Sequence, residues 1–271
     1  MAFRPINDQR HAITEVVFGA RLSSAPTPGA IEEMVALHAT FKDELPRLSK
    51  GATFALYFGD AVPPDAPPST VAFESFKPDG THAWRLRIEG DKILVNCLDY
   101  SRWDQVSAKA YELLNKISAP LFASNATIEQ ILLQYLDRFE WQGDRAAYDA
   151  GQLLKPDSAM MPAHIFDRGP LWHCYQGWFF DIAAERHQRV LERVQITSAL
   201  ESGEDTKLLV TIDDFMQLKM EEPLSFEQAF RNENGTAKPL FELLHANNKS
   251  TLNQLLTDEM TNRIELNGKQ E

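Results

Sequence analysis

The fold is decided by residues 84–98, which read WRLRIEGDKILVNCL. Apolar and charged side chains alternate up to Glu89, as in a strand with one buried face. Gly90 and Asp91 then supply a two-residue turn, and an apolar run continues from Lys92 to Leu98. The stretch therefore predicts a β-hairpin against which further strands and helices can pack.

A helix and a long strand are predicted directly after this hairpin. Ser101 is the predicted N-cap of the helix, and Pro120 ends it. The apolar face of the helix has helical spacing and consists of Trp103, Val106, Ala110, Leu113 and Ile117. Apolar side chains then alternate from Ile131 to Trp141, in a strand longer than most in globular proteins. Such a strand needs a sheet to pair with.

The chain before the hairpin adds further strands and another helix. Residues 13–22 alternate as a strand with one apolar side, and residues 71–76 predict another strand. Between them, Thr27 caps a helix whose apolar side continues to Leu48. Residues 11–142 therefore form a predicted N-terminal α+β subdomain.

The second half predicts an antiparallel meander followed by helices. Residues 143–170 are punctuated by glycine and proline and form a predicted connection. Three strands are predicted, at 172–181, 187–200 and 207–218. Ser225 and Gln228 form a capping box for a short helix, and a long final helix runs from Pro239 to Ile264. Residues 171–266 form the predicted C-terminal subdomain.

The predicted fold class is α+β, with two antiparallel-sheet subdomains that are each packed by helices, and with a long C-terminal helix. Both halves place strands before helices, which leaves a structural duplication open although the halves share no alignable repeat.

Composition and charge exclude several classes of function. A formal charge of −12 disfavours binding to phosphate backbones, so nucleic acid is not an expected partner, and this possibility stays open only if the basic residues Arg186, Arg189 and Arg193 lie together. The 13 glycines fall in no phosphate-binding spacing, and the histidines and cysteines in no zinc-binding spacing. No nucleotide, cofactor or metal is therefore predicted. Cys97 and Cys174 lie in apolar settings typical of reduced thiols, and neither a signal peptide nor a membrane span is evident, so we expect a cytoplasmic protein.

Two aspartates are candidate polar-site residues. Asp137 falls on the apolar side of the long strand, between Tyr135 and Phe139, where a carboxylate must be paired or have a raised pKa. Structural pairing and a functional role both fit this position. Asp213 and Asp214 are neighbours in a strand, so they point to opposite faces and cannot easily bind one metal ion.

Polar residues interrupt the apolar stripe of the final helix at 247–251. His245 and Asn248 are i, i+3 neighbours, and Thr251 continues the same ridge. This pattern predicts either a polar pocket or wet contact with another chain at His245 and Asn248, or simply a helix centre that faces solvent.

Aromatic residues gather in the first strand of the meander. Trp172, Trp178 and Phe180 are the candidate interface residues, because exposed aromatic side chains are typical of protein–protein contacts.

Several short motifs resemble those of a sporadically distributed family of uncharacterised bacterial proteins of about this length. They are the Glu15-Val16-Val17-Phe18 strand, Tyr100-x-x-Trp103, Tyr135 with Arg138, Ile212-Asp213, Leu244-His245 and Leu256-Thr257-Asp258-Glu259. The family has no assigned activity, so the resemblance implies no catalytic residue. Its patchy distribution is typical of genes on mobile elements, including antiviral defence systems, and implies such a setting here.

Two hypotheses of function follow. The first is a non-catalytic interaction or sensing protein of a bacterial multi-component system, plausible in antiviral (anti-phage) defence, whose partner is another protein or a second copy. The second is a hydrolase that uses Asp137, Asp213 or His245, and it predicts that these residues converge in one concave pocket.

Overall fold

Two compact units divide the chain, and each is assembled from separate stretches of sequence. The structure is a computed structural model that describes residues 2–7, 11–51, 70–122, 125–182, 189–201, 206–231 and 235–268. Unit 1 comprises Met1–Val16, Leu133–Leu218 and Phe241–Glu271, and unit 2 comprises Val17–Leu132 and Lys219–Leu240. The long strands β2 (Ile13–Leu22), β7 (Thr127–Trp141) and β10 (Lys207–Ser225) contribute residues to both units.

In unit 2 the strand order is β3-β4-β5-β6-β2. The first four of these strands are antiparallel neighbours and comprise β3 (Arg47–Lys50), β4 (Thr70–Phe76), β5 (His82–Glu89) and β6 (Lys92–Cys97). The predicted hairpin is confirmed, because Glu89 of β5 pairs with Lys92 of β6. Gly90 has a φ of +57° in the turn, a backbone conformation that favours glycine.

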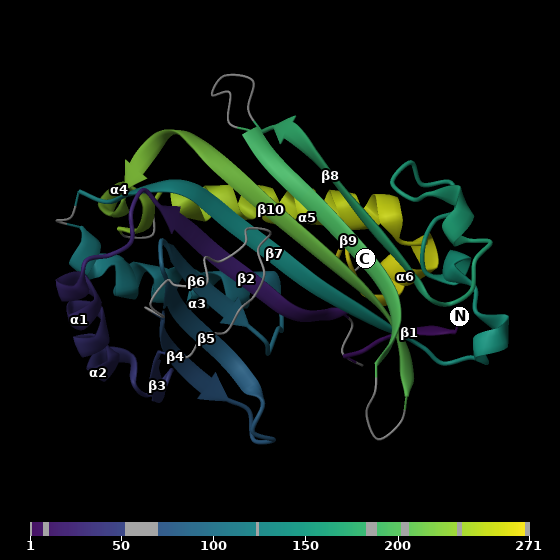
Figure 1. Ribbon diagram of the computed structural model, residues 1–271, viewed down its shortest axis with the longest axis horizontal. Coiled ribbons are helices and arrows are strands. Elements are labelled where there is room, and N and C mark those ends of the chain that lie inside the picture. Colours follow the sequence, from purple (N-terminus) through teal and green to yellow (C-terminus); the bar gives the residue numbers. More distant parts are fainter. Residues whose placement is uncertain are drawn as a thin grey trace. The chain divides into compact units, whose positions relative to one another are not determined.

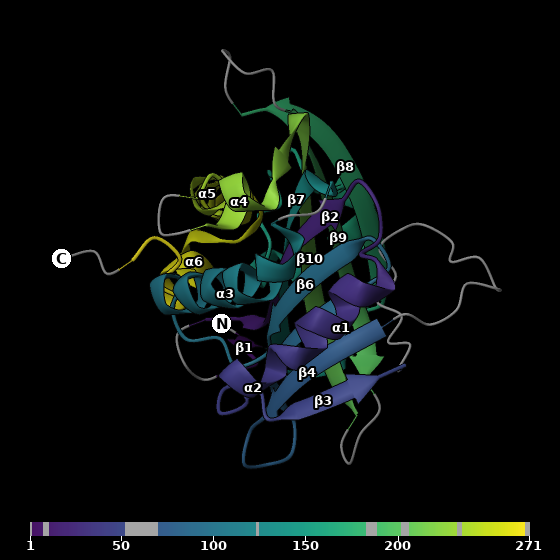
Figure 2. The same ribbon diagram turned by 90° about the vertical axis from the view of Figure 1, so that its left-hand side faces the viewer.

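Helices in unit 2 follow the sequence pattern with two differences at their ends. The helices are α1 (Pro28–Ala36), α2 (His38–Phe41), α3 (Trp103–Ser118) and α4 (Phe226–Phe230), with a 3₁₀ turn, η1 (Ala119–Leu121). The predicted apolar face of α3 is buried, and Figure 2 shows α3 alongside β6. α3 begins at Trp103, so Arg102 and not Ser101 is its N-cap residue, and the Ser101 hydroxyl donates a hydrogen bond to Gln105 Oε1. The helix predicted to reach Leu48 is also shorter, since residues 47–50 form β3.

In unit 1 the strand order is β2-β7-β10-β9-β8, and β1 (Phe3–Pro5) pairs with β7. The last two strands are β8 (Trp172–Asp181) and β9 (Arg189–Glu201), and they form an antiparallel ladder over the whole of β8. α5 (Ala237–Leu255) passes behind β7, β10 and β9 in Figure 1, and Figure 2, where it is seen nearly end-on, places it to one side of these strands.

The prediction of one helix up to Ile264 is wrong. The chain forms α5, leaves the helix at Leu256, which bridges to Leu154, and starts α6 (Asp258–Arg263). Thr257 caps α6 by accepting a hydrogen bond from the amide of Met260. A threonine that satisfies a free amide in this way favours a new helix over continuation of the old one.

Residues 143–170 contribute to the core of unit 1. They contain the 3₁₀ turns η2 (Arg145–Ala147), η3 (Ala150–Gln152) and η4 (Ala163–Ile165). Their buried side chains pack with strands and helices of the unit and include Leu153, Leu154, Met161 and Ile165. The subdomain boundaries predicted at 11–142, 143–170 and 171–266 stay a prediction.

The fold class is confirmed as α+β, with antiparallel strand pairs and a long helix near the C-terminus. The structural duplication stays a prediction. Within the described part of the chain, no helix has both the length and the apolar character that a membrane span requires.

Candidate functional site

Asp137 lies on β7, where it is 1% exposed. Within the described structure, its Oδ2 atom has no hydrogen-bond partner, and burial raises the pKa of Asp137 to about 7. The sequence required a carboxylate at this position either to be paired or to have a raised pKa, and the raised pKa is the condition that is met. A carboxyl group with such a pKa is half protonated near neutral pH.

His245 of α5 pairs with a tyrosine on β7, the strand that also carries Asp137. The Tyr135 Oη and His245 Nδ1 atoms are 2.8 Å apart, and the two ring centroids are 5.9 Å apart. Burial, with a smaller contribution from Lys249, lowers the pKa of His245 to about 4. The imidazole is therefore neutral at physiological pH, as a histidine in a hydrogen-bonded, largely buried position should be.

Two further carboxyl groups face α5 from the neighbouring strands. Asp214 of β10 is 0% exposed and accepts a hydrogen bond of 2.8 Å from Asn248 Nδ2. Glu192 of β9 is 1% exposed, and its two carboxylate oxygens accept hydrogen bonds of 2.6 Å from Thr251 Oγ1 and from Asn247 Nδ2. The polar interruption of α5 thus faces the sheet of unit 1, and the solvent-facing alternative for Asn248 and Thr251 is wrong.

We use the name carboxyl cluster for three acids of the sheet and three polar residues of α5: Asp137, Glu192 and Asp214, with Asn247, Asn248 and Thr251. Burial, together with the charges of Glu192 and Asp137, holds the pKa of Asp214 well above its usual range. Burial also raises the pKa of Glu192, against the hydrogen bonds from Thr251 and Asn247. Neutral amides and a hydroxyl thus contact these acids, and their raised pKa values favour the uncharged forms.

Asp213 does not belong to the carboxyl cluster. It accepts a hydrogen bond of 2.7 Å from Gln134 Nε2, whereas its neighbour Asp214 bonds α5, so the predicted alternation of the two aspartates is confirmed. Burial raises the pKa of Asp213, and the Arg193 charge opposes this effect. Of the four predicted polar residues, the structure brings Asp137, His245 and Asn248 to the face under α5 and places Asp213 elsewhere.

Sequence reasoning missed Glu192 and the role of Asp214. A signal for Glu192 was present, because it alternates with Val190, Val194 and Ile196, which are all buried. A charged residue in such an alternation lies on the core-facing side of its strand. Within the described residues, no group of three or more His, Cys, Asp or Glu side chains has the arrangement of a metal site.

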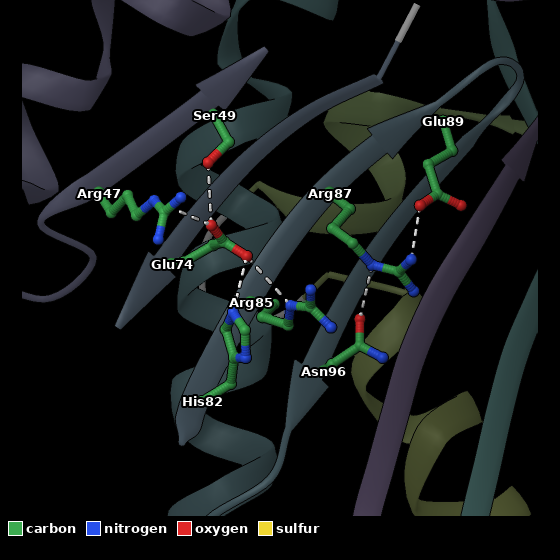
Figure 3. A network of polar contacts seen from close by, with 8 residues as sticks. All are labelled: Arg47, Ser49, Glu74, His82, Arg85, Arg87, Glu89 and Asn96. Carbon is green, nitrogen blue, oxygen red and sulfur yellow. Dashed lines mark hydrogen bonds and ion pairs between the residues drawn. The ribbon is translucent and has the colours of Figure 1, made fainter. Parts of the chain in front are cut away.

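Another buried carboxylate, Glu74, lies in unit 2 and was also missed. Glu74 Oε1 accepts hydrogen bonds from His82 Nε2 at 3.0 Å and from Arg85 Nε at 3.2 Å (Figure 3). Its Oε2 accepts one from Ser49 Oγ at 3.0 Å and forms an ion pair with Arg47 at 3.7 Å. Burial acts to raise the pKa of Glu74, but the hydrogen bonds from Ser49 and Arg85 and the nearby positive charges lower it below its usual value.

A neighbouring polar group in unit 2 is built around Arg87 of β5, which is 0% exposed. Its guanidinium donates hydrogen bonds to Asn96 on β6 and to Glu89 on its own strand (Figure 3). These contacts tie adjacent strands together, so the arrangement of Glu74 and Arg87 is that of a structural network.

The candidate interface residues lie on the inner face of β8. Trp172 and Trp178 pack against the core of unit 1, and the indole of Trp172 donates to Tyr148 Oη at 3.0 Å. Phe180 is half-buried on the same face. The opposite face of β8 carries Tyr175 and Phe179, which are 58% and 65% exposed. We call this face, formed by His173, Tyr175, Gly177, Phe179 and Asp181, the β8 outer face.

Comparisons of the chain with models of protein families, with curated proteins and with solved structures gave no match.

Proposed function

We propose that this protein is a non-catalytic interaction protein, which binds another protein chain through the β8 outer face. The observation that carries this proposal is the exposure of Tyr175 and Phe179, 58% and 65%, on one face of a strand at the end of the sheet order. Scattered exposed apolar residues are normal, but aromatic side chains that share a face of an edge strand are typical of binding surfaces.

The carboxyl cluster supports a structural role rather than hydrolysis. Its three acids are at most 1% exposed, and the hydrogen bonds of Glu192 and Asp214 join α5 to β9 and β10. A general acid or base must reach a substrate within hydrogen-bond distance, which these buried groups do not offer. Asp213, which the hydrolase hypothesis also requires, bonds Gln134 and not this cluster.

The proposed setting is a bacterial multi-component system, with antiviral defence as its biological role. The family resemblance of the sequence motifs supports this setting, and the protein would act there through a partner rather than through chemistry of its own.

Affinity capture with matched variants tests the proposed function. The tagged wild-type chain and a Tyr175→Ser/Phe179→Ser variant are used to capture proteins from a bacterial host. Leu200→Ser is the control, because Leu200 is also exposed, at 41%, but lies on β9. We expect a stoichiometric bound chain that the double variant loses and the control keeps. Equal capture by all three proteins would contradict the proposal.

A further inference from the structure

β8 has the properties of an unprotected sheet edge. Its ladder with β9 covers all ten residues, and the backbone hydrogen bonds of the described residues give it no other strand partner. Natural proteins protect such edges with short strands, prolines, bulges or charged side chains. β8 contains no proline, and its charged side chain is Asp181 at its last position. Its side-chain hydrogen bonds to the described residues of 143–170 come from the inner face, from Trp172 to Tyr148 and from Gln176 to Met160.

The sequence of β8 is complementary to itself when it is read antiparallel about Gly177. Residues at equal distances from Gly177 then face each other on the outer face, so Tyr175 lies opposite Phe179 and His173 lies opposite Asp181. We infer that a second copy of this chain binds here, by antiparallel pairing of β8 with β8 about Gly177. This inference rests on the proposed function and names its partner.

Side-chain chemistry favours this register. Each copy contributes one Tyr175 and one Phe179, so the pairing covers two aromatic pairs that are otherwise exposed to water. His173 and Asp181 are of complementary polarity, although His173 Nδ1 already lies 3.3 Å from Thr197 Oγ1. Among the described residues, Asp181 forms an ion pair of 3.4 Å with the exposed Arg189 through one carboxylate oxygen, which leaves room for a second donor. A two-fold axis through Gly177 repeats each of these contacts, as a closed dimer requires.

The net charge of the chain affects how two copies can associate. A formal charge of −12 on each copy opposes random association. The outer surface of the β8–β9 ladder, however, includes Arg189 and Arg193, which pair with Asp181 and Gly177 in the register. The negative charge is therefore not concentrated on this edge.

Mass and cross-linking measurements together test the inference. Light scattering across a concentration series should give a dimer for the wild-type chain and for Leu200→Ser, and a monomer for Tyr175→Ser/Phe179→Ser. Gly177 is not substituted, because an added Cβ would meet the Glu192 carbonyl oxygen of β9 at 3.0 Å and disturb the ladder itself.

The register is tested by disulfide cross-linking between two variants. Tyr175→Cys and Phe179→Cys are each made in a Cys174→Ala background and are distinguished by tags of different mass. The remaining cysteine, Cys97, is buried, and burial raises its pKa to about 12, so its thiol is unreactive. We expect a disulfide in the oxidised mixture and little in either variant alone, because position 175 faces position 179 of the second copy and not itself.

Each outcome separates the inference from the proposed function. A dimer that persists in the double variant, or cross-links formed equally by each variant alone, would overturn the inferred pairing. A monomer at all concentrations that still captures a different protein through Tyr175 and Phe179 would overturn the second copy as partner while the proposed function stands. A monomer without any captured chain would contradict both.

Discussion

Unit 1 and unit 2 bury carboxyl groups in opposite ways. In unit 2, Glu74 is 2% exposed and keeps its charge, because Arg47, His82 and Arg85 surround it and its pKa is lowered. In unit 1, Asp214 is 0% exposed and meets an amide and another acid, so its pKa is raised well above its usual range. The partners of a buried acid, and not its burial alone, therefore decide whether it carries charge.

The edge strands of the two units also differ, because one is short and charged and the other is long and aromatic. Among the described strands of unit 2, β3 ends the order with four residues, of which Arg47 and Lys50 are exposed and charged. β8 ends the order in unit 1 with ten residues and presents Tyr175 and Phe179 to solvent. A short charged edge prevents pairing, whereas a long aromatic edge favours it, so the comparison assigns binding to unit 1.

Loss of the Glu74 charge should have the largest effect. We expect Glu74→Gln to lower the free energy of unfolding by about 3 kcal/mol, because it removes the carboxylate of a buried ion pair. Urea denaturation measures this change. Arg47→Gln is the control and should cost less than about 1 kcal/mol, since Arg47 is 63% exposed. A smaller loss for Glu74→Gln than for the control would contradict the assigned role of Glu74.

The carboxyl cluster should make unit 1 less stable as the pH rises. The folded pKa of Asp137, about 7, lies above its usual value of 3.8, so the folded state holds a proton that the unfolded state has released. Its stabilising contribution is complete below pH 3.8 and is lost as the pH rises through 7. The folded pKa lies about 3 units above 3.8, and each unit corresponds to about 1.4 kcal/mol, so we expect a loss of up to about 4 kcal/mol.

The matching experiment compares wild type with Asp137→Asn by urea denaturation from pH 5 to 8. The amide cannot titrate, so the variant should gain stability relative to wild type as the pH rises. Glu74, with its lowered pKa, has the opposite dependence: its contribution is present above its usual pKa and is lost as the pH falls through the folded value. A constant difference between the two proteins would refute the assignment for Asp137.

Asp214→Asn should change stability far less than Glu74→Gln. Burial holds the pKa of Asp214 well above its usual range, which favours the neutral form, so we expect an uncharged amide of similar shape to replace it at a cost of less than about 1 kcal/mol at neutral pH. Denaturation curves of the two variants give this contrast directly. If Asp214→Asn were the more damaging substitution, Asp214 would have to be ionised in the folded protein.

The smallest effect on stability is expected on the β8 outer face. Tyr175→Ser/Phe179→Ser should change the unfolding free energy of the isolated chain by no more than about 0.5 kcal/mol, because both side chains are mostly exposed. Thermal unfolding at low protein concentration measures this. A large loss would mean that the two aromatic residues stabilise the fold and that the binding experiments report unfolding.

Local patterns in the sequence predicted the elements better than the contacts between them. The β5–β6 hairpin and the buried face of α3 followed from alternation and helical spacing alone. The polar break in α5 was visible, but its direction depends on which face the sheet covers, and Asn248 turned out to be 2% exposed. Sequence alone does not show which side of α5 the sheet covers.

Contacts that depend on strand register were beyond sequence reasoning. Glu74 meets Ser49 and Arg85, which are 25 and 11 residues away, because β3 and β5 flank β4 in one specific register. The candidate interface residues named from the sequence also lie on the inner face of β8: Trp178 packs on the core, whereas Phe179 faces solvent. A shift of one residue reverses every side chain of a strand.

Hydrogen exchange of the two edge strands tests the central claim, that β8 is the binding edge, most directly. Amide exchange in β8 and β3 is measured by mass spectrometry at low and at high concentrations of the wild-type protein. We predict that residues 172–181 become protected as the concentration rises, whereas residues 47–50 exchange at the same rate throughout. Protection of β3 instead, or an unchanged rate in β8 at every concentration, would contradict the account.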